Sequence, residues 1–391
     1  MQQPMTAHWL KVACVSGLLG LSVLPAQAAD CTPVEIAIAD ACVTVEQVAA
    51  GIREVVRAGM AELDLNAVIV SVEIDGVPVI AEATGDSMTG VPARLDMHFR
   101  NGAVAIPYLA TVVLRLQEDK VLSLDDKLSQ WFPDYPRADE VTLGMLLNST
   151  SGYADFVNLE ILPLYEDVFR QYEPAELLEM GLSQPMACDP GTCFNYAHTN
   201  FVILGQVLTK ASGKPVEDLI AEYVLTPLSL KNTRSESTAI IQEPVLHAFT
   251  DERGIYEDST YWNPSWTLAE GAIMTTDIAD LLASATAIGS GSLISPESHA
   301  LLIAPSTATF PPFNDKVYFG LGVLVTNSWV IQTPSFAGYS AAMAYLPSRK
   351  IAIAVTATSG EDTPDQPRPT DALFADLGTY LAPDMAPIMR R

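Results

Sequence analysis

Apolar residues recur at helical or strand spacing along most of the chain. Residues 45–63 repeat apolar positions every three or four residues, which predicts an amphipathic helix. Residues 67–74 and 77–83 are apolar and rich in β-branched side chains on either side of Asp75 and Gly76, which predicts a β-hairpin. We therefore expect an antiparallel sheet with a helix packed on one face.

The order of elements is sheet, helices, sheet. Helical spacing recurs over 106–117, 142–147, 175–181, 201–212, 216–223, 276–288 and 373–381. Strand patterns occupy 319–325, 329–331, 341–346 and 351–356. This order predicts an α+β fold, an α/β sandwich with an antiparallel sheet from residues 45–100 and 246–385 and an inserted all-helical part over 101–245.

The first 28 residues resemble a signal peptide. His8 and Lys11 precede an apolar run over 12–24, and Ala26-Gln27-Ala28 offers a cleavage site before Ala29. A retained N-terminal anchor is the alternative. We predict a periplasmic or secreted protein in which residues 29–44 form a linker, with no membrane span after signal removal.

Composition changes this prediction only by excluding partners. Hydrophobic residues make up 49% of the 391 residues, which is enough for a substantial core. Asp and Glu number 47 against 21 Lys and Arg, so the formal charge is −26. Phosphate backbones would be repelled, and we expect no nucleic-acid partner.

The cysteines suggest disulfides. Once Cys14 leaves with the signal, four remain: Cys31, Cys42, Cys188 and Cys193. An even number in an oxidising compartment favours Cys31–Cys42 and Cys188–Cys193 pairs. Metal binding is the alternative, but no histidine lies at ligand spacing around either pair. We expect no metal and no cofactor.

The stretch over 99–107 carries the strongest family signal. It reads Phe-Arg-Asn-Gly-Ala-Val-Ala-Ile-Pro and is followed at 122–126 by Leu-Ser-Leu-Asp-Asp. It resembles the Phe-Arg-x-Gly-Ser-x-x-Lys and Leu-x-Leu-Asp-Asp segments of serine β-lactamases and penicillin-binding proteins, including class C enzymes, D-alanyl-D-alanine carboxypeptidases and related esterases. Ala103 and Ile106 stand where that family has its nucleophilic Ser and its Lys.

Five further segments resemble motifs of the same family in the same order. Residues 146–152 resemble Leu-Leu-x-His-Thr-Ser-Gly, with Ser149 in place of His, and residues 190–201 resemble Pro-Gly-x-x-x-x-Tyr-Ser-Asn-x-x-Tyr. Residues 226–233, 269–279 and 337–347 resemble its Pro-Leu-Gly-Met, Ala-Gly-Gly and Pro-Gly-Tyr-Ser segments. The resemblance implies a β-lactamase/transpeptidase-like fold over 45–385.

The family's chemistry needs a Ser with a Lys one turn later, a Tyr or Ser that relays the proton, and a basic residue on an edge strand. Here Tyr196 is kept, and His198 stands where Asn is usual. Gln332, Thr333 and Pro334 occupy the place of the Lys-Thr-Gly motif, so only the Thr is kept. None of the seven positions (Ala103, Ile106, Tyr196, His198, Gln332, Thr333, Pro334) is expected to be catalytic; they are vestigial.

Several side chains allow two interpretations. Tyr196 is a vestigial relay or pocket wall, or else a packed tyrosine. His198 is a new base, or else a structural histidine. Ser340 weakly resembles a nucleophile elbow, and a turn serine is the alternative. The other histidines, at 98, 247 and 299, have no carboxylate at useful spacing in the sequence.

We therefore predict a catalytically silent member of the family that binds a peptide-like or small-molecule ligand in its cleft. The residues missing at 106 and 332 remove two positive charges, which predicts weak affinity for carboxylate-bearing β-lactams. One alternative is an active serine-type hydrolase, esterase or carboxypeptidase that works through non-family residues such as Tyr196 with His198 or Ser340. Another is a structural or partner-binding periplasmic protein whose cleft Ile106 has collapsed. The sequence does not predict the oligomeric state.

Overall fold

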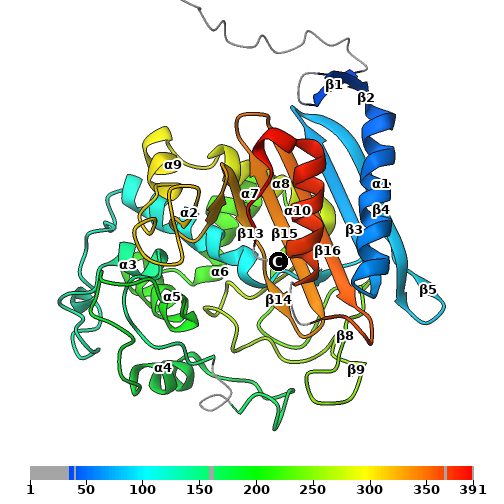
Figure 1. The fold of residues 1–391 in the computed structure, drawn as a ribbon. Helices are drawn as coiled ribbons and strands as arrows, with labels where there is room; N and C mark the ends of the chain where they lie inside the picture. Colours follow the sequence, from blue (N-terminus) through cyan, green and yellow to red (C-terminus); the bar gives the residue numbers. More distant parts are fainter. Residues whose placement is uncertain (1–34, 39–40, 158–162, 365–367, 390–391) are drawn as a thin grey trace, which may run out of the picture.

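The computed structural model describes residues 35–38, 41–157, 163–364 and 368–389 (Figure 1). The predicted signal peptide and Cys31 lie outside the described residues. Glu35–Ile38 (β1) and Ala41–Thr44 (β2) pair antiparallel, so the described part of the predicted linker is a hairpin. The two four-residue strands satisfy each other's backbone hydrogen-bonding groups.

One large antiparallel sheet organises the fold. Its strand order is β11-β12-β13-β15-β16-β3-β4-β5, and β14 pairs with β15. Its N-terminal strands are Leu65–Ile74 (β3), Val77–Met88 (β4) and Val91–Pro92 (β5). The C-terminal strands are Val317–Phe319 (β11), Leu324–Thr326 (β12), Trp329–Gln332 (β13), Ser335–Phe336 (β14), Tyr339–Leu346 (β15) and Ile351–Ser359 (β16). Both chain ends therefore build the sheet, joined at β3 and β16, where Ile74 pairs with Ile351.

Helices cover both faces of this sheet. Val45–Glu62 (α1) and Pro369–Leu381 (α10) pack together on the face shown in front in Figure 1. Val68, Val70 and Val72 of β3 point into that layer, while Ile69 points into the core on the other face. The period-two alternation of a strand buried on both sides explains this division. Thr44 and Gln47 cap the start of α1 reciprocally.

The other face of the sheet contacts Ile278–Ser290 (α8) and leads into the helical part. That part holds Ala105–Glu118 (α2), Leu143–Leu147 (α3), Pro174–Leu182 (α4), His198–Ser212 (α5), Val216–Ile220 (α6) and Thr226–Leu228 (α7). Most α2 side chains are buried, including Ile106 and Tyr108, so α2 is the central helix of the larger core. Figure 1 places α2, α3, α5 and α6 beside the sheet, away from α1.

A second, smaller sheet of short strands leads into α2. Phe99–Arg100 (β6), Met274–Thr276 (β10) and Arg234–Ser235 (β7) form a three-stranded sheet, and β6 leads directly into the head of α2. Phe249–Thr250 (β8) pairs with Glu257–Asp258 (β9).

Three details of the structure differ from the sequence predictions. The single strand expected over 319–325 is two strands, β11 and β12, because the chain turns at Gly322, whose φ is +74°. Pro296–Leu302 (α9) was not expected; Ser295 caps it and Pro296 opens it. The helix expected over 216–223 is α-helical only to Ile220 and continues as a π-helix, Ala221–Leu225.

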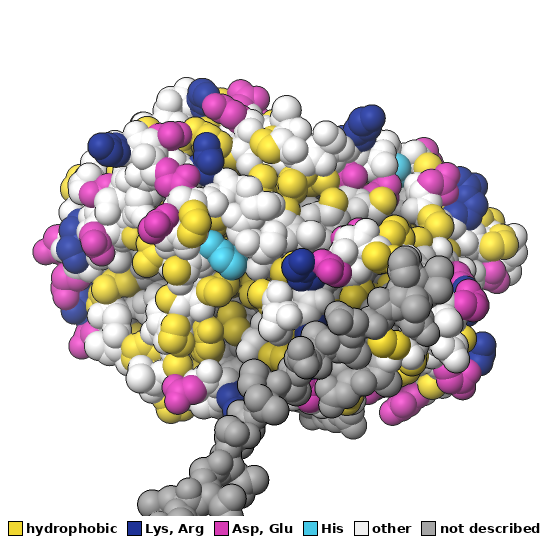
Figure 2. Space-filling view, turned by 90° about the horizontal axis from the view of Figure 1, so that it is seen from above, with side chains coloured by type: hydrophobic (Ala, Val, Ile, Leu, Met, Phe, Trp, Pro, Cys, Tyr) yellow, Lys and Arg dark blue, Asp and Glu magenta, His cyan; other side chains and the backbone are white. Residues whose placement is uncertain are grey.

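Charged side chains of both signs lie on the surface (Figure 2). On the face seen in Figure 2, acidic and basic side chains are intermingled around apolar groups. Among the described residues, no helix combines the length and apolar character needed to cross a bilayer.

Candidate functional site: the cleft at the head of α2

Ala103 lies in a short helical turn, Gly102–Val104, that opens α2. The turn starts from Gly102 at φ +53°, a left-handed conformation that favours glycine. The Ala103 side chain is half-buried and lines two adjoining cavities, one of about 430 Å³ and one of about 50 Å³. The position at which the sequence resemblance predicts the nucleophile therefore faces two cavities and carries only a methyl group.

The larger cavity brings most of the predicted positions together. Six of the seven vestigial positions line it: Ala103, Tyr196, His198, Gln332, Thr333 and Pro334. They come from the head of α2, the start of α5 and the end of β13. We call this cavity the cleft.

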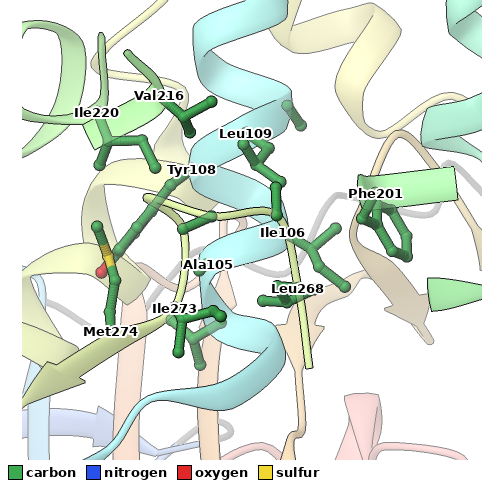
Figure 3. Packing of buried hydrophobic residues seen from close by; sticks show 14 of the residues in the cluster. Ala105, Ile106, Tyr108, Leu109, Phe201, Val216, Ile220, Leu268, Ile273 and Met274 are labelled. Atoms are coloured by element: carbon green, nitrogen blue, oxygen red, sulfur yellow. The ribbon is translucent and has the colours of Figure 1, made fainter. Parts of the chain in front are cut away.

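Ile106 is the exception. We expected it to form an apolar pocket floor, but it lines neither cavity and is fully buried. Figure 3 shows its side chain near Leu268 and Phe201, within the core. It also lies against Gly322, where an added Cβ would be 2.8 Å from Ile106 Cγ2. Residue 106 has become part of the core because an apolar branched side chain packs where a charged amine would need a partner.

The end of β13 is held by its own side chains. Gln332 is buried; its Nε2 donates to the carbonyl of Gly322 at 3.1 Å, and its Oε1 accepts from the Thr333 N–H at 3.1 Å. Gln332 is therefore used structurally. Pro334 packs directly on Gly102, which places the strand end beside the head of α2.

One cation in the cleft was not predicted. Arg368, which precedes α10, lines the cleft and donates to the Thr333 carbonyl at 2.9 Å and to its Oγ1 at 3.3 Å. Its guanidinium also lies 3.0 Å from Oδ2 of Asp371. The sequence places it 35 residues from Thr333, in a proline-rich loop without a motif, so spacing alone could not assign it.

His198 is fixed by a carboxylate that sequence reasoning also missed. Its Nδ1 lies 3.1 Å from Oδ2 of Asp155, and its backbone N–H donates to Oδ1 at 3.0 Å. Ala197, the residue before α5, has no side-chain cap to offer, so Asp155 caps this helix from another loop. Burial alone would raise the pKa of Asp155, but hydrogen bonds from the His198 ring and from the Val157 and His198 N–H groups outweigh it and hold that pKa below its ordinary value.

Tyr196 lies beside this pair. Its ring contacts the rings of His198, Phe201 and Phe319 at centroid distances of 5.3, 5.7 and 6.2 Å. Burial raises the pKa of its hydroxyl well above the ordinary value, and the Asp155 charge adds to the rise. Tyr196 therefore stays protonated and can donate a hydrogen bond, but it is a poor base.

Other candidates lie elsewhere. Ser340 is buried in β15, lines neither of the two cavities at Ala103, and sits in a strand rather than at a strand-to-helix turn. His247, expected to stand apart, has Nδ1 3.1 Å from Oδ2 of Asp258, a contact that the fold makes between β9 and the segment before β8. Within the described part of the chain, no group of three or more His, Cys, Asp or Glu side chains is placed to hold a metal ion.

The predicted Cys188–Cys193 disulfide is present, with a Cα–Cα distance of 6.2 Å. It closes the loop before Tyr196. The loop packs on Gly152, whose carbonyl accepts from the Ala187 N–H at 2.8 Å. The disulfide thus lies beside the segment that carries Asp155.

A family model described as Beta-lactamase matches residues 52–377, most of the chain. The chain belongs to the beta-lactamase family. Its antiparallel sheet with an inserted helical part is the β-lactamase/transpeptidase-like fold that the sequence predicted. The sequence motifs predict that Ala103 stands at the place of the nucleophile, His198 at that of the Asn of the second motif, and Gln332 and Pro334 at two places of the third.

The chain is also similar to individual proteins. The chain is 31% identical over 147 residues to penicillin-binding protein 4 of Amycolatopsis lactamdurans, covering 36% of this chain and 37% of that protein. It is 28% identical over 165 residues to esterase EstB of Burkholderia gladioli, covering 39% of this chain and 42% of that protein. It therefore spans about two fifths of the length of these relatives.

A solved structure extends the comparison to the whole fold. D-amino acid amidase from Ochrobactrum anthropi SV3, complexed with L-phenylalanine amide, matches with a TM-score of 0.74 and 20% identity, covering 85% of this chain and 98% of that one. At this identity the likeness concerns the fold alone.

Proposed function

We propose that this beta-lactamase-family protein binds a small carboxylate-bearing, peptide-like ligand in the cleft and does not form an acyl-enzyme at residue 103. The observation that carries the proposal is the methyl group of Ala103 at the head of α2, facing the cleft. A methyl group has no electron pair to attack an acyl carbon. The amine that would take the proton is also missing, because residue 106 is an isoleucine, whose hydrocarbon side chain is buried in the core.

Arg368 supports the choice of a carboxylate. Its side chain is 39% exposed and its orientation is held by Thr333 and Asp371. Its Nε and Nη2 face Asp371, and its Nη1 and Nη2 donate to Thr333, so one Nη1 N–H is left to donate a charge-assisted hydrogen bond to a ligand carboxylate. The sequence predicted that the cleft had lost two positive charges; Arg368 supplies one from a different element.

The size and lining of the cleft support a small ligand. A cavity of about 430 Å³ lies within the range of small-molecule sites, and its aromatic and polar walls offer apolar contact with a few hydrogen bonds. This open space weighs against a purely structural protein with a collapsed cleft. The names of relatives, which include a D-aminopeptidase and D-alanyl-D-alanine-carboxypeptidase/endopeptidase AmpH, favour amino-acid and peptide derivatives.

The test is calorimetric titration with N-acetyl-D-alanyl-D-alanine and with its C-terminal carboxamide. The proposal expects saturable binding of the acid and at least tenfold weaker binding of the amide, since charge-assisted hydrogen bonds contribute about 1.5–3 kcal/mol. Equal binding of both, or binding of neither, would overturn the carboxylate assignment.

Export is part of the same proposal. It rests on the leader-like pattern over 1–28 and is consistent with the Cys188–Cys193 disulfide. N-terminal sequencing of protein from the periplasmic fraction is expected to begin at Ala29. A mature chain that retains residue 1 would contradict cleavage.

A further inference from the structure

The Asp155–His198 contact has the geometry of the positioning half of a catalytic triad. Nδ1 of His198 lies 3.1 and 3.2 Å from the two carboxylate oxygens of Asp155. The carboxylate is itself held by the N–H groups of Val157 at 3.1 Å and His198 at 3.0 Å. A carboxylate at Nδ1 favours the tautomer with its proton there, which leaves a lone pair on Nε2.

The second ring nitrogen of His198, Nε2, is free to accept a proton from a molecule in the cavities. Within the described part of the chain, no hydrogen bond involves Nε2 of His198, and the ring lines both cavities that meet at Ala103. The side chain is 21% exposed. Phe156, Tyr196 and Trp266 surround the ring at centroid distances of 6.1, 5.3 and 6.3 Å, so its orientation is set by packing as well as by Asp155.

The charged and titratable groups around His198 come from four elements. They are Asp155, the protonated Tyr196, Arg100 of β6 in the smaller cavity, and Arg368 before α10 in the cleft. Asp155 is the one that contacts the ring nitrogen. Its negative charge stabilises the imidazolium that forms when Nε2 accepts a proton.

We propose that His198, oriented by Asp155, is a general base that activates water for the direct hydrolysis of small esters in the cleft. This inference goes beyond the proposed binding function and uses the same cleft. The family's route passes through a serine ester; here water takes the place of the missing hydroxyl. His198 is the catalytic residue, and Asp155 is a positioning residue.

The step balances without a cofactor. The water oxygen forms a bond to the ester carbonyl carbon while one water proton moves to Nε2 of His198. The tetrahedral intermediate then breaks its bond to the alcohol oxygen. The imidazolium returns the proton to that oxygen, or to solvent when the leaving group is a stable aryloxide, so ester and water give acid and alcohol. Asp155 remains ionised throughout.

Esters are the favoured substrate class because an alcohol or aryloxide leaves with less protonation by an acid than an amide nitrogen requires. A single base contributes about 10²- to 10⁴-fold to a rate. Ser335 also lines both cavities, and its hydroxyl is the competing nucleophile. The water mechanism predicts that Ser335 is dispensable.

The experiment follows hydrolysis of 4-nitrophenyl esters of acetic acid and N-acetyl-D-alanine by the full chain, with intact-mass measurement during turnover. We expect saturable hydrolysis without a burst, no added mass, and a rate that rises with one ionisation between about pH 5 and 8. His198→Ala should lose at least 100-fold, and added imidazole should restore part of the rate. Asp155→Asn should lower kcat about tenfold with little change in KM, because the ring loses its orientation and not its contact with substrate.

The matched control is His247→Gln. His247 makes the same Nδ1 contact to a carboxylate, at 3.1 Å from Asp258, but lines neither cavity. Its removal should leave the rate unchanged. Full activity in His198→Ala, loss of activity in Ser335→Ala with a covalent adduct in the wild type, or no hydrolysis above a heat-denatured sample would each overturn the inference.

Failure here is distinguishable from failure of the proposed binding function. If N-acetyl-D-alanyl-D-alanine binds but no ester is hydrolysed, the Asp155–His198 pair is structural and the binding proposal stands. If esters are hydrolysed through His198 but the acid and its amide bind equally, the general-base role of His198 stands and the assignment of a carboxylate ligand fails.

Discussion

Gly102 and Pro334 are in direct contact at the mouth of the cleft: a Cβ atom on Gly102 would lie 2.6 Å from the Cβ of Pro334. The sequence resemblance predicts glycine at the place of Pro334, and Gly102 precedes Ala103, which is predicted to stand at the place of the nucleophile. The end of the strand therefore packs closely against the head of α2, and this packing needs a residue without a Cβ at position 102.

Gly102→Ala is expected to destabilise the protein by about 2–4 kcal/mol, from left-handed strain at φ +53° plus overpacking. In a Pro334→Gly background the nearest remaining Pro334 atom is the Cα at 3.9 Å, so the penalty should fall to about 1–2 kcal/mol. Urea unfolding of the four proteins measures this. Additive effects of the two changes would show that the contact is absent.

Arg368→Gln should remove most of the preference for N-acetyl-D-alanyl-D-alanine over its carboxamide, because the variant keeps polar atoms but loses the charge near Thr333. The control is Arg349→Gln. Arg349 forms a comparable surface ion pair, at 2.8 Å from Asp384, and does not line the cleft. Calorimetry of both variants checks the prediction, and an unchanged preference in Arg368→Gln would contradict it.

Replacing Ile106 by Lys should lower the unfolding free energy more than replacing Ala103 by Ser. Ile106→Lys places an unpaired ammonium in a fully buried site and is expected to cost about 3–5 kcal/mol of unfolding free energy. Ala103→Ser adds a hydroxyl facing the cleft and should cost less than about 1 kcal/mol. Ile106→Met, which conserves volume, is the control. A stable Ile106→Lys variant would mean that residue 106 reaches solvent or a buried partner.

The lowered pKa of Asp155 predicts a pH dependence of stability. A carboxyl whose folded pKa lies below its unfolded value stabilises the folded state above the unfolded pKa, near 3.9, and loses that contribution as pH falls through the folded pKa. The difference in unfolding free energy between wild type and Asp155→Asn should therefore shrink below about pH 4. Denaturant melts at several acidic pH values check this, and a difference that grows with acidity would contradict it.

The sequence predicted what depends on local patterns. The amphipathic spacing of α1 and the turn at Asp75 and Gly76 are visible without tertiary information. So was the absence of Ser and Lys at 103 and 106, because the flanking motifs define the register. The split of 319–325 into two strands was missed because a continuous apolar run does not reveal a left-handed glycine at its centre.

The site residues that were missed come from long-range contacts. Asp155 lies 43 residues before His198, and Arg368 lies 35 residues after Thr333. Neither belongs to a motif: Asp155 reaches the site through its contact with His198 at the start of α5, and Arg368 through its contact with Thr333 after β13. Likewise, Ile106 is buried beside Leu268 and Phe201, and no local sequence pattern links it to either residue (Figure 3).

The central claim is that residue 103 cannot form an acyl-enzyme. The most direct test is intact-mass spectrometry of the purified full chain after incubation with a fluorescent penicillin. We expect the mass to remain that of the unmodified protein, with no fluorescent band after denaturation. A stoichiometric increase by the mass of the penicillin, mapped to a residue in the cleft, would contradict the claim.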